Sequence, residues 1–490
     1  MESNQCLNNL PMKCSHEIKD LIETVDSRAL TTKINALEAV ERDLLNAEKE
    51  FNLPVQDDKL TYHNLAAIVG SSLVTSSIKR DGKMLIAMVG LPLRGKTYLA
   101  KSLKRHFDWI GLSSEIFSTV EIRRENINIH PPIEFYTEEG EKARHKMAEI
   151  TLQRALRALM SNVDIAIYDA TNITKRKRIW LVDQVKSCSK LHSQVIFVES
   201  ICNDPAIIKE NIEETNRFSP EYIGIPFEEA TEDIKKRVSH YTKCYEPLSE
   251  NEGFPFVKLI NGHRQLITNL MSGYIPGKIL MLLMNQHCRP RTIFMSRHGE
   301  SEYNNQGRIG GNSCLTPAGR LYASKLFEFV KRIFPPDSSE LVVWTSTMVR
   351  TGETVKAMED HFDVIKWKAL DEINAGDMEG LTYEFVAENM SEQYQARKED
   401  KLNYRYPGRG ESYRDVFIRL EPVMFEMLRC RTPLLIVGHQ AILRVLYGYL
   451  KRHTPQECPT LPMPLHTVIE LTPHAYYCDE ALHYPLEMVE

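Results

Sequence analysis

The sequence lacks the features of several protein classes. It has ten cysteines but no C-x-x-C pair, which suits reduced thiols better than a disulfide framework or a zinc site. No apolar run approaches the roughly 18 to 20 residues that cross a bilayer, and the start, MESNQCLNNL, does not combine a basic with an apolar region as a secretory signal does. The net charge of −5 gives no reason to expect nucleic-acid binding. We therefore expect a cytoplasmic protein that binds neither a membrane nor nucleic acid.

Two α/β domains are expected from the order of the apolar segments. The 490 residues exceed what one core of ordinary size holds. From Met84 onward, the apolar runs MLIAMV, DIAIYD, QVIFVES and FVKLI alternate with helical stretches, and the pattern restarts with TIFMS, LVVWTS and PLLIVGH. Such alternation predicts parallel sheets with crossover helices. We place the first domain at 81–290 and the second at 291–490.

Residues 1–80 contain no chemical motif. Apolar residues recur there at roughly helical spacing, with charges between them, so we predict a helical N-terminal extension. Such an extension could pack on a domain, contact a second subunit or act as a regulatory arm. The pattern does not separate these roles.

The segment GLPLRGKT fits the phosphate-binding pattern G-x-x-x-x-G-K-[ST], between a candidate strand and a candidate helix. A glycine turn that merely carries a lysine is the alternative. In a nucleotide site, backbone N–H groups surround the phosphates of ATP, Lys96 reaches the β and γ phosphates, and the Thr97 hydroxyl holds Mg²⁺. The loop consists of Gly90, Leu91, Pro92, Leu93, Arg94, Gly95, Lys96 and Thr97.

A carboxylate should end a neighbouring strand of such a site. The segment DIAIYDATN supplies Asp169, followed by Thr171. Asp169 alone could simply cap the next helix. Beside the loop, we expect it to orient magnesium or to accept the proton of an acceptor hydroxyl, two roles that the sequence does not separate. Four arginines could hold an anionic acceptor or remain solvated surface charges: Arg123, Arg124, Arg144 and Arg237.

A second group of phosphate-handling residues begins at SRHGES, directly after the apolar run TIFM. Its histidine, His298, could by itself be a structural residue at a strand end. The later segments WTSTMVRTGET, EINAG and VGHQA add Arg350, Glu372 and His439. Together these residues supply what phosphoryl transfer to histidine requires: a neutral imidazole nucleophile, donors for the phosphoryl oxygens, and a carboxylic acid for the leaving alkoxide.

The second half resembles the histidine phosphatase (phosphoglycerate mutase-like) family, in which the histidine of RHG becomes phosphorylated. With the upstream loop and the segments FVESIC, EEATED, GRIGG, RYPGRGESY and CPTLPMPLHTVIELTP, residues 80–475 resemble the bifunctional 6-phosphofructo-2-kinase/fructose-2,6-bisphosphatases. The resemblance implies a P-loop kinase domain followed by a histidine phosphatase domain. It also implies synthesis of fructose 2,6-bisphosphate from fructose 6-phosphate and ATP, its hydrolysis, and a homodimer in the cytoplasm.

The resemblance also implies roles for individual residues. His298 becomes the nucleophile and Glu372 the proton donor. Around the transferred phosphoryl group it places Arg297, Asn304, Gly310, Arg350 and His439. Positions that hold the rest of the sugar bisphosphate, chiefly its 6-phosphate, are Tyr383, Arg397, Lys401, Arg405, Tyr413, Gln440 and Arg444. Those implied for fructose 6-phosphate in the kinase are Arg124, Arg144, Thr171, Arg237 and Tyr241.

Three residues of the kinase half depart from the family pattern. Leu93 stands where members usually have Ala, Ile122 where they have Tyr, and Asn216 where they generally have Lys. We expect the changes at Leu93 and Ile122 to weaken the kinase, Leu93 by crowding the phosphate loop. At Asn216, the neighbouring Arg217 could take over with a shifted register. In the phosphatase half, EINAG replaces EIDAG without changing Glu372. Two alternatives stay open: a phosphatase whose kinase domain binds nucleotide mainly as a regulator, and a weakly catalytic interaction protein.

Overall fold

The computed structural model describes most of the chain after residue 81. The described ranges are 82–125, 138–188, 193–218, 222, 224–262, 264–286, 291–335, 340–474 and 477–487. The chain divides into two units, Met1–Thr61 and Tyr62–Glu490, and the extension predicted over 1–80 lies outside the described residues. Within the described ranges, no helix is both long enough and apolar enough to cross a membrane.

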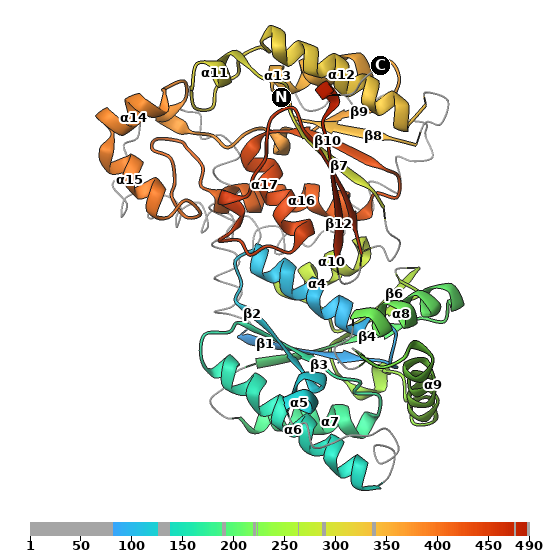
Figure 1. Ribbon diagram of the computed structural model, residues 1–490. Helices are drawn as coiled ribbons and strands as arrows, with labels where there is room; N and C mark the ends of the chain where they lie inside the picture. The colour runs from blue at the N-terminus through green and yellow to red at the C-terminus, as the bar shows by residue number, and fades with distance from the viewer. Residues whose placement is uncertain are drawn as a thin grey trace, which may run out of the picture. The chain divides into compact units, whose positions relative to one another are not determined.

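The first half of the described chain forms a six-stranded sheet with helices around it (Figure 1). The strand order is β2-β3-β1-β4-β5-β6, and neighbours are parallel except β5 with β6. The strands are β1 (Lys83–Val89), β2 (Ser114–Ser118), β3 (Ile165–Asp169), β4 (Ser193–Ile201), β5 (Phe256–Ile260) and β6 (Gln265–Asn269). The helices are α4 (Lys96–Trp109), α5 (Thr119–Glu125), α6 (Glu138–Met160), α7 (Lys175–Ser187), α8 (Pro205–Phe218), α9 (Phe227–Lys243) and α10 (Tyr274–Asn285).

The second half forms another six-stranded sheet, in the order β12-β11-β7-β10-β8-β9. Pairing is parallel from β7 to β9 and antiparallel at β11 and β12. The strands are β7 (Ile293–Arg297), β8 (Val342–Thr345), β9 (Asp363–Lys366), β10 (Leu434–Gly438), β11 (Val468–Pro473) and β12 (Cys478–His483). The helices are α11 (Glu302–Asn305), α12 (Pro317–Ile333), α13 (Val349–Val355), α14 (Tyr383–Asn389), α15 (Ser391–Glu399), α16 (Tyr413–Arg429) and α17 (Gln440–Lys451).

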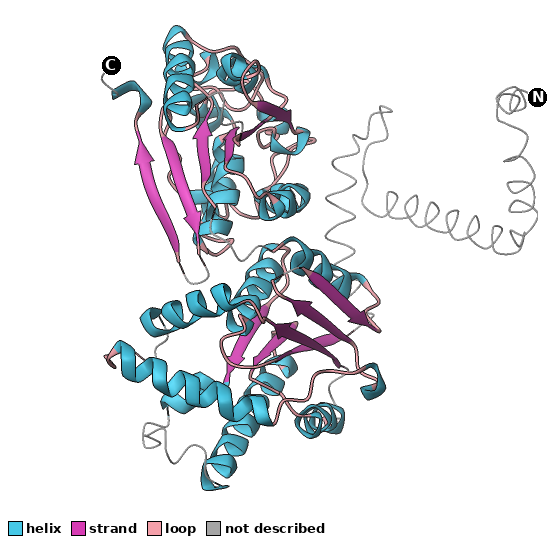
Figure 2. Ribbon diagram, turned by 90° about the vertical axis from the view of Figure 1, so that its right-hand side faces the viewer, coloured by secondary structure: helices cyan, strands magenta, loops and turns pink. Residues whose placement is uncertain are grey.

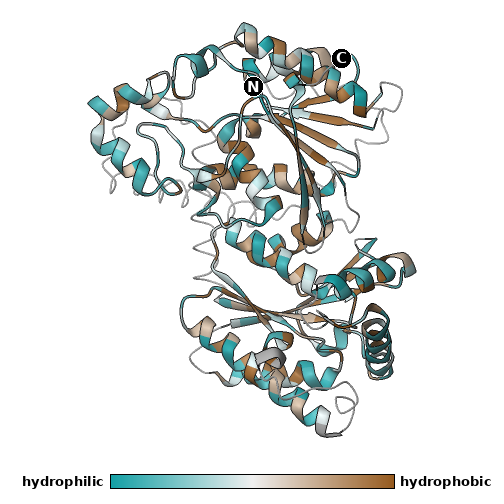
Figure 3. Ribbon diagram, viewed as in Figure 1, coloured by the Kyte–Doolittle hydropathy of each residue, from teal (hydrophilic) through white to brown (hydrophobic). Residues whose placement is uncertain are grey.

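The central strands are apolar on both faces. Met84, Ile86 and Met88 of β1 belong to one buried cluster, and the alternate residues Leu85 and Ala87 belong to another. Figure 2 shows helices flanking the strands of each sheet, and Figure 3 shows the strands as largely hydrophobic. Burial on both faces explains the continuous apolar runs of the sequence. The prediction of two α/β domains is confirmed.

The strand register brings the candidate catalytic segments together. In the first sheet, β1 pairs with β3 and β4 on its two sides, with Ala87 opposite Tyr168. The phosphate loop after β1 therefore lies next to Asp169, the last residue of β3. In the second sheet, Arg297 of β7 pairs with Gly438 of β10. The segments that follow, which begin with His298 and His439, thus leave the sheet side by side, at the edge where ligands of such sheets bind.

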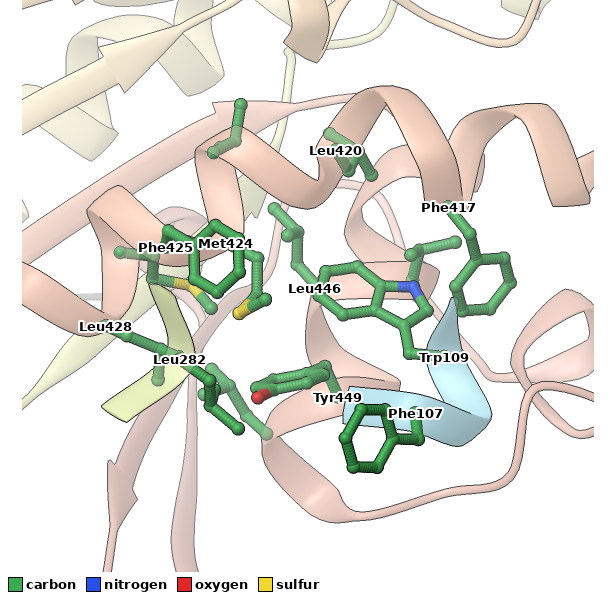
Figure 4. Close-up of a cluster of buried hydrophobic side chains, with 14 of the residues drawn as sticks. Phe107, Trp109, Leu282, Phe417, Leu420, Met424, Phe425, Leu428, Leu446 and Tyr449 are labelled. Atoms are coloured by element: carbon green, nitrogen blue, oxygen red, sulfur yellow. The ribbon is translucent and has the colours of Figure 1, made fainter. Parts of the chain in front are cut away.

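Helix α4 also packs against the second domain. Near its C-terminal end, the ring centroid of Trp109 lies 5.8 Å from that of Phe417 in α16 and 4.6 Å from that of Tyr449 in α17 (Figure 4). The ring of His106 lies 5.2 Å from Phe425. One hydrophobic cluster therefore includes residues of both domains.

Candidate active sites

The phosphate loop joins β1 to α4. Gly90 has a φ of 131°, and a Cβ there would lie 2.5 Å from the backbone oxygen of Ser200, so a side chain does not fit. Gly95, with a φ of 78°, precedes the first residue of α4, Lys96. The Lys96 Nζ donates to the Leu91 carbonyl at 2.6 Å, which holds the ammonium over the loop. The helix N-terminus and this ammonium both favour an anion.

Thr97 and Asp169 form the second part of this site. The Thr97 hydroxyl donates to Asp169 Oδ2 at 2.8 Å. Asp169 is 5% exposed, and burial raises the pKa of its carboxyl. Burial likewise lowers the pKa of the nearby Lys96 ammonium to about 8. A hydroxyl beside a carboxylate provides oxygen ligands of the kind that Mg²⁺ prefers, so this pair fits the magnesium of a nucleotide complex.

Leu93, inside the loop, has a φ of 61°, a left-handed conformation that is unusual for leucine. Its side chain packs on a small buried cluster of Tyr222, Ala230 and Ile234. Its carbonyl accepts a hydrogen bond from the Asn211 amide at 3.0 Å. The side chain therefore contacts α9, and these contacts support the loop.

A cavity of about 280 Å³ adjoins the loop. Arg94 and Gly95 line it from the loop, and Asn211 and Arg217 line it from α8. The second domain contributes Arg452, His474 and Tyr477. The cavity extends from the phosphate loop, so it suits the nucleoside part of ATP.

The residues expected to hold the sugar phosphate come from helices α5, α6 and α9 and from the loop after β3. Burial and then the Arg144 charge lower the pKa of Lys177 of α7 and of His240 of α9, so Arg144 of α6 acts on both groups. Arg237 is ion-paired with Asp233 at 3.5 Å. Tyr241 follows His240 on α9, and the Thr171 carbonyl accepts from Gly90 N–H at 3.0 Å. The side chains of Arg123 and Arg124 lie outside the described residues.

In the second domain, His298 is buried at the end of β7, with 2% of its surface exposed. Its Nδ1 lies 2.7 Å from the Gly299 carbonyl and therefore donates to it. Its Nε2 accepts from Arg350 Nε at 3.0 Å. Burial and the Arg350 charge hold the pKa of His298 well below its usual value. The imidazole is therefore neutral, with its lone pair on Nε2, as a nucleophile requires.

Cationic and N–H groups surround this nitrogen. Arg350, 3% exposed, also donates to the Gly311 carbonyl at 2.6 Å. Arg297 donates to the Met463 carbonyl at 3.0 Å. The ring of His439 lies 5.2 Å from that of His298, and burial followed by the Arg350 charge lowers its pKa strongly. These groups are fixed before any ligand binds, which suits the stabilisation of a transferring phosphoryl group.

Two residues complete this end of the site. Glu372 Oε1 accepts from the backbone N–H of Ala441, in the first turn of α17, at 3.3 Å. Burial lowers the pKa of Arg297 and of Arg350, and the charge of Glu372 partly offsets that effect in both. Glu372 therefore lies beside the two arginines. Asn304 Oδ1 accepts from the Ser301 N–H at 3.1 Å. A carboxyl group therefore lies next to the cationic pocket.

A further basic cluster lies beside the histidine site. Arg444 donates to the Tyr413 hydroxyl at 3.3 Å, and the Arg397 guanidinium lies 5.8 Å from the Tyr383 ring centroid. Burial and the charges of Arg444 and Arg397 lower the pKa of Lys401 to about 8. Several cations close enough to repel one another suit a phosphate dianion.

Sequence comparisons support the two-domain assignment. Residues 71–290 match the family model for 6-phosphofructo-2-kinase, and residues 293–482 match the model for the histidine phosphatase superfamily, branch 1. A 6-phosphofructo-2-kinase/fructose-2,6-bisphosphatase of Caenorhabditis elegans is 40% identical over 412 residues, which cover 81% of this chain and 88% of the relative.

The chain belongs to the 6-phosphofructo-2-kinase/fructose-2,6-bisphosphatase family.

Other relatives agree. A protein of the same name from Gallus gallus is 40% identical and covers 83% of this chain and 86% of its own length. One from Arabidopsis thaliana is also 40% identical, over 80% of this chain, and the match spans 53% of that longer protein. The resemblance predicted from the motifs is confirmed, and the chain carries both a kinase domain and a phosphatase domain.

Two residues singled out from the family pattern have other partners in the structure. Arg405, with its side chain 46% exposed, pairs with Asp415 at 2.5 Å. Asn216 donates from its amide to the Thr231 hydroxyl at 2.9 Å, between α8 and α9. Gln440 is the first residue of α17, and Gly310 has a φ of 61°.

Other residues of the sites were missed in the sequence. Lys177 lies with Arg144, as described above. The Ser346 hydroxyl forms a hydrogen bond with His439 Nε2 at 2.8 Å. The Thr354 hydroxyl accepts a hydrogen bond from the Gly299 N–H at 3.0 Å. Hydroxyl and lysine residues outside a recognisable motif give no signal in a single sequence. Only the fold places them against the catalytic groups.

Proposed function

We propose that this family member both makes and hydrolyses fructose 2,6-bisphosphate. The kinase site transfers the γ-phosphate of ATP to the C2 hydroxyl of fructose 6-phosphate, and the phosphatase site removes it through a phosphohistidine. The observation that carries the proposal is the neutral His298 held against Arg350, in a chain that also places Lys96 beside Asp169. Two phosphoryl-transfer sites in one chain suit an enzyme that forms and removes the same ester.

In the kinase site, the chain contributes position and charge. Lys96 and the backbone N–H groups of its loop bind the β and γ phosphates of ATP. Thr97 and Asp169 hold the metal side of the nucleotide, and Arg144 with Lys177 binds the sugar phosphate. Magnesium, when bound, neutralises charge on the phosphate oxygens. The direct contact between Thr97 and Asp169 favours metal orientation as the role of Asp169.

In the phosphatase site, His298 Nε2 attacks the phosphorus of the 2-phosphate. An N–P bond forms, the P–O bond to C2 breaks, and Glu372 gives its proton to the departing oxygen. Arg350 turns its donor from His298 to the phosphoryl oxygens, which Arg297 also stabilises. Water then attacks the phosphohistidine, with Glu372 as the base, and releases inorganic phosphate. The basic cluster around Arg444 holds the 6-phosphate throughout.

A phosphatase with a weak kinase is the second candidate. Asn216 stands where the family generally has lysine and bonds Thr231 through its neutral amide, so only the neighbouring Arg217, which lines the cavity beside the phosphate loop, could supply the charge there. Seven described cysteines are free thiols, which supports a reducing, cytoplasmic location. Family membership is the reason to expect a homodimer.

Two single variants test the proposal, with both activities measured on each purified protein. Lys96→Ala should lower fructose 2,6-bisphosphate synthesis by about 10²-fold or more and leave hydrolysis intact, because each preorganised charge contact is worth that much in rate. His298→Ala should do the reverse. If Lys96→Ala retains the parent's rate of synthesis, the kinase assignment is wrong. A parent that hydrolyses the ester and binds ATP without forming the ester would establish the second candidate.

A further inference from the structure

One ring nitrogen of His439 has no partner in the described part of the chain. The side chain is fully buried directly after β10, and its ring centroid lies 5.2 Å from that of His298. Its Nε2 forms a hydrogen bond with the Ser346 hydroxyl at 2.8 Å. Its Nδ1 is buried and unbonded. Buried polar atoms are nearly always paired in native proteins, so Nδ1 calls for a ligand.

The position of the ring proton decides which ligand Nδ1 accepts. Burial, followed by the charge of Arg350, lowers the pKa of His439 strongly, so the ring is neutral and carries one proton. A proton on Nδ1 can be donated to a phosphoryl oxygen. A proton on Nε2 leaves a lone pair on Nδ1, which repels an anion. The tautomer of His439 therefore controls whether this ring stabilises a phosphoryl group.

The Ser346 hydroxyl is placed to set this tautomer, because the partner of one ring nitrogen determines where the proton lies. Ser346 directly follows β8 and is fully buried. Its hydroxyl accepts from the Met348 N–H at 3.1 Å and lies 2.7 Å from the Thr351 hydroxyl. Because a hydroxyl has one proton, Ser346 can donate to Thr351 or to His439, but not to both.

Two arrangements of protons satisfy these contacts. In the first, Thr351 donates to the Met348 carbonyl, 2.8 Å away, Ser346 donates to Thr351, and His439 donates from Nε2 to Ser346. In the second, Thr351 donates to Ser346, Ser346 donates to His439 Nε2, and the ring proton lies on Nδ1. The Met348 carbonyl then keeps its bond from the Gly352 N–H at 3.1 Å. A bound anion favours the second arrangement, because it accepts the Nδ1 proton.

We propose that Ser346 and Thr351 are positioning residues that set the tautomer of His439 for phosphoryl transfer. This inference rests on the phosphatase function proposed above. With the 2-phosphate bound, Ser346 donates to His439 Nε2, and the Nδ1–H donates to a phosphoryl oxygen. The two tautomers exchange through solvent: Nε2 gives up one proton and Nδ1 takes one, so the charge of the ring does not change. The substrate then selects the Nδ1–H form.

Removal of the two hydroxyls should have different consequences. Ser346→Ala removes the donor to His439 Nε2, so the Nδ1–H form loses its support. Thr351→Val has nearly the same shape as the parent but removes the competing acceptor of the Ser346 proton. Ser346 then donates to His439, and the Nδ1–H form is favoured even without a ligand. A purely structural role of the two hydroxyls gives no reason for this difference.

Nitrogen-15 NMR of the full-length protein, labelled at histidine, measures the tautomer directly, because protonated and bare ring nitrogens differ in chemical shift. The His439 signals are those missing from His439→Gln. We expect the proton on Nδ1 in the parent with inorganic phosphate, and in Thr351→Val with or without phosphate. Ser346→Ala should show a larger Nε2–H fraction than the parent. A proton on Nε2 in the phosphate-bound parent, or no change in Thr351→Val, would overturn the proposal.

Single-turnover hydrolysis of fructose 2,6-bisphosphate gives the functional effect. Ser346→Ala should slow it by about 10-fold, the worth of one hydrogen bond, and Thr351→Val should stay within about 3-fold of the parent. In a His439→Ala background, Ser346→Ala should cost nothing further, because Ser346 acts through His439. An equal cost in both backgrounds would refute this role.

Two controls keep the outcomes distinct. Unfolding in urea at the parent's midpoint shows that a variant is folded, and Ser346→Cys, with a weaker donor, replaces Ser346→Ala if the alanine variant fails this check. If the parent does not hydrolyse the ester, the proposed phosphatase function fails. The NMR spectra with inorganic phosphate would still show whether the hydroxyls set the tautomer of His439.

Discussion

Replacement of Leu93 by alanine separates two explanations of this residue. Crowding of the phosphate loop, the expectation from sequence, predicts that alanine speeds the kinase or tightens ATP binding. The structure favours the opposite sign, because the Leu93 side chain packs on Ala230 and Ile234 of α9. Since α9 also carries Arg237 and Tyr241, a loosened α9 should bind fructose 6-phosphate less well.

The magnitude follows from the apolar groups removed. Leucine to alanine deletes three carbon groups, each worth about 0.8 kcal/mol when fully buried. Leu93 is only partly buried, so we expect a loss of about 1 kcal/mol in the packing of α9 on the loop. If that loss falls on the sugar-binding conformation, it corresponds to a rise of about 5-fold in the KM for fructose 6-phosphate.

The assay is steady-state kinase kinetics with fructose 6-phosphate and ATP varied separately, with phosphatase activity as the internal control. Leu93→Met keeps the apolar contact and should behave like the parent. Leu93→Gly removes the contact and also relieves the strain of the left-handed φ, which costs about 1 kcal/mol for a residue with a side chain. It should therefore affect stability less than Leu93→Ala. A faster kinase in Leu93→Ala, with an unchanged KM for fructose 6-phosphate, would refute the packing explanation.

Three further predictions concern single side chains. In a rapid-quench experiment with substrate labelled at the 2-phosphate, Glu372→Gln should slow the formation of phosphohistidine by about 10²-fold, within the usual range for a general acid. His298 should still accept the label. Labelling at the parent's rate would show that Glu372 is not the proton donor. The pKa of Lys401 is lowered to about 8, so Lys401 is charged below that pH and neutral above it. The kcat/KM for fructose 2,6-bisphosphate should therefore fall as the pH rises through 8. In Lys401→Arg this fall should be absent from the pH profile. Arg178 is fully buried and donates from Nε and a terminal nitrogen to Glu252, at 2.8 and 2.7 Å. Arg178→Met leaves the Glu252 carboxylate unpaired, so the free energy of unfolding measured by urea titration should fall by about 3–5 kcal/mol. A loss below about 1 kcal/mol would show that the ion pair is not essential to stability.

The sequence predicted those parts of the sites that lie in contiguous residues at strand ends. The phosphate loop and the RHG segment each combine a recognisable spacing with an apolar run before it, so their chemistry and their place in the sheet could be inferred together. Asp169 and His439 were found for the same reason, because each directly follows or ends a buried strand.

The remainder depends on contacts between distant helices. Lys177 of α7 lies close enough to Arg144 of α6 for the Arg144 charge to lower its pKa, and no local pattern marks that pair. Likewise, Arg405 matches a substrate-binding position in sequence, but in the structure it pairs with Asp415. The effect of Leu93 on the kinase stays a prediction, because the direction of its side chain depends on a positive φ that leucine seldom adopts and that no local pattern marks.

The contact between α4 and the second domain limits how this protein can change over evolutionary time. The first turn of α4 carries Lys96, and its last turn places Trp109 against Phe417 and Tyr449. A lineage that no longer needs the kinase can lose Lys96 by a single mutation. It cannot discard the helix without exposing apolar surface of the phosphatase domain to water. In this architecture, loss of one activity therefore leaves a silent domain in place and not a shorter chain.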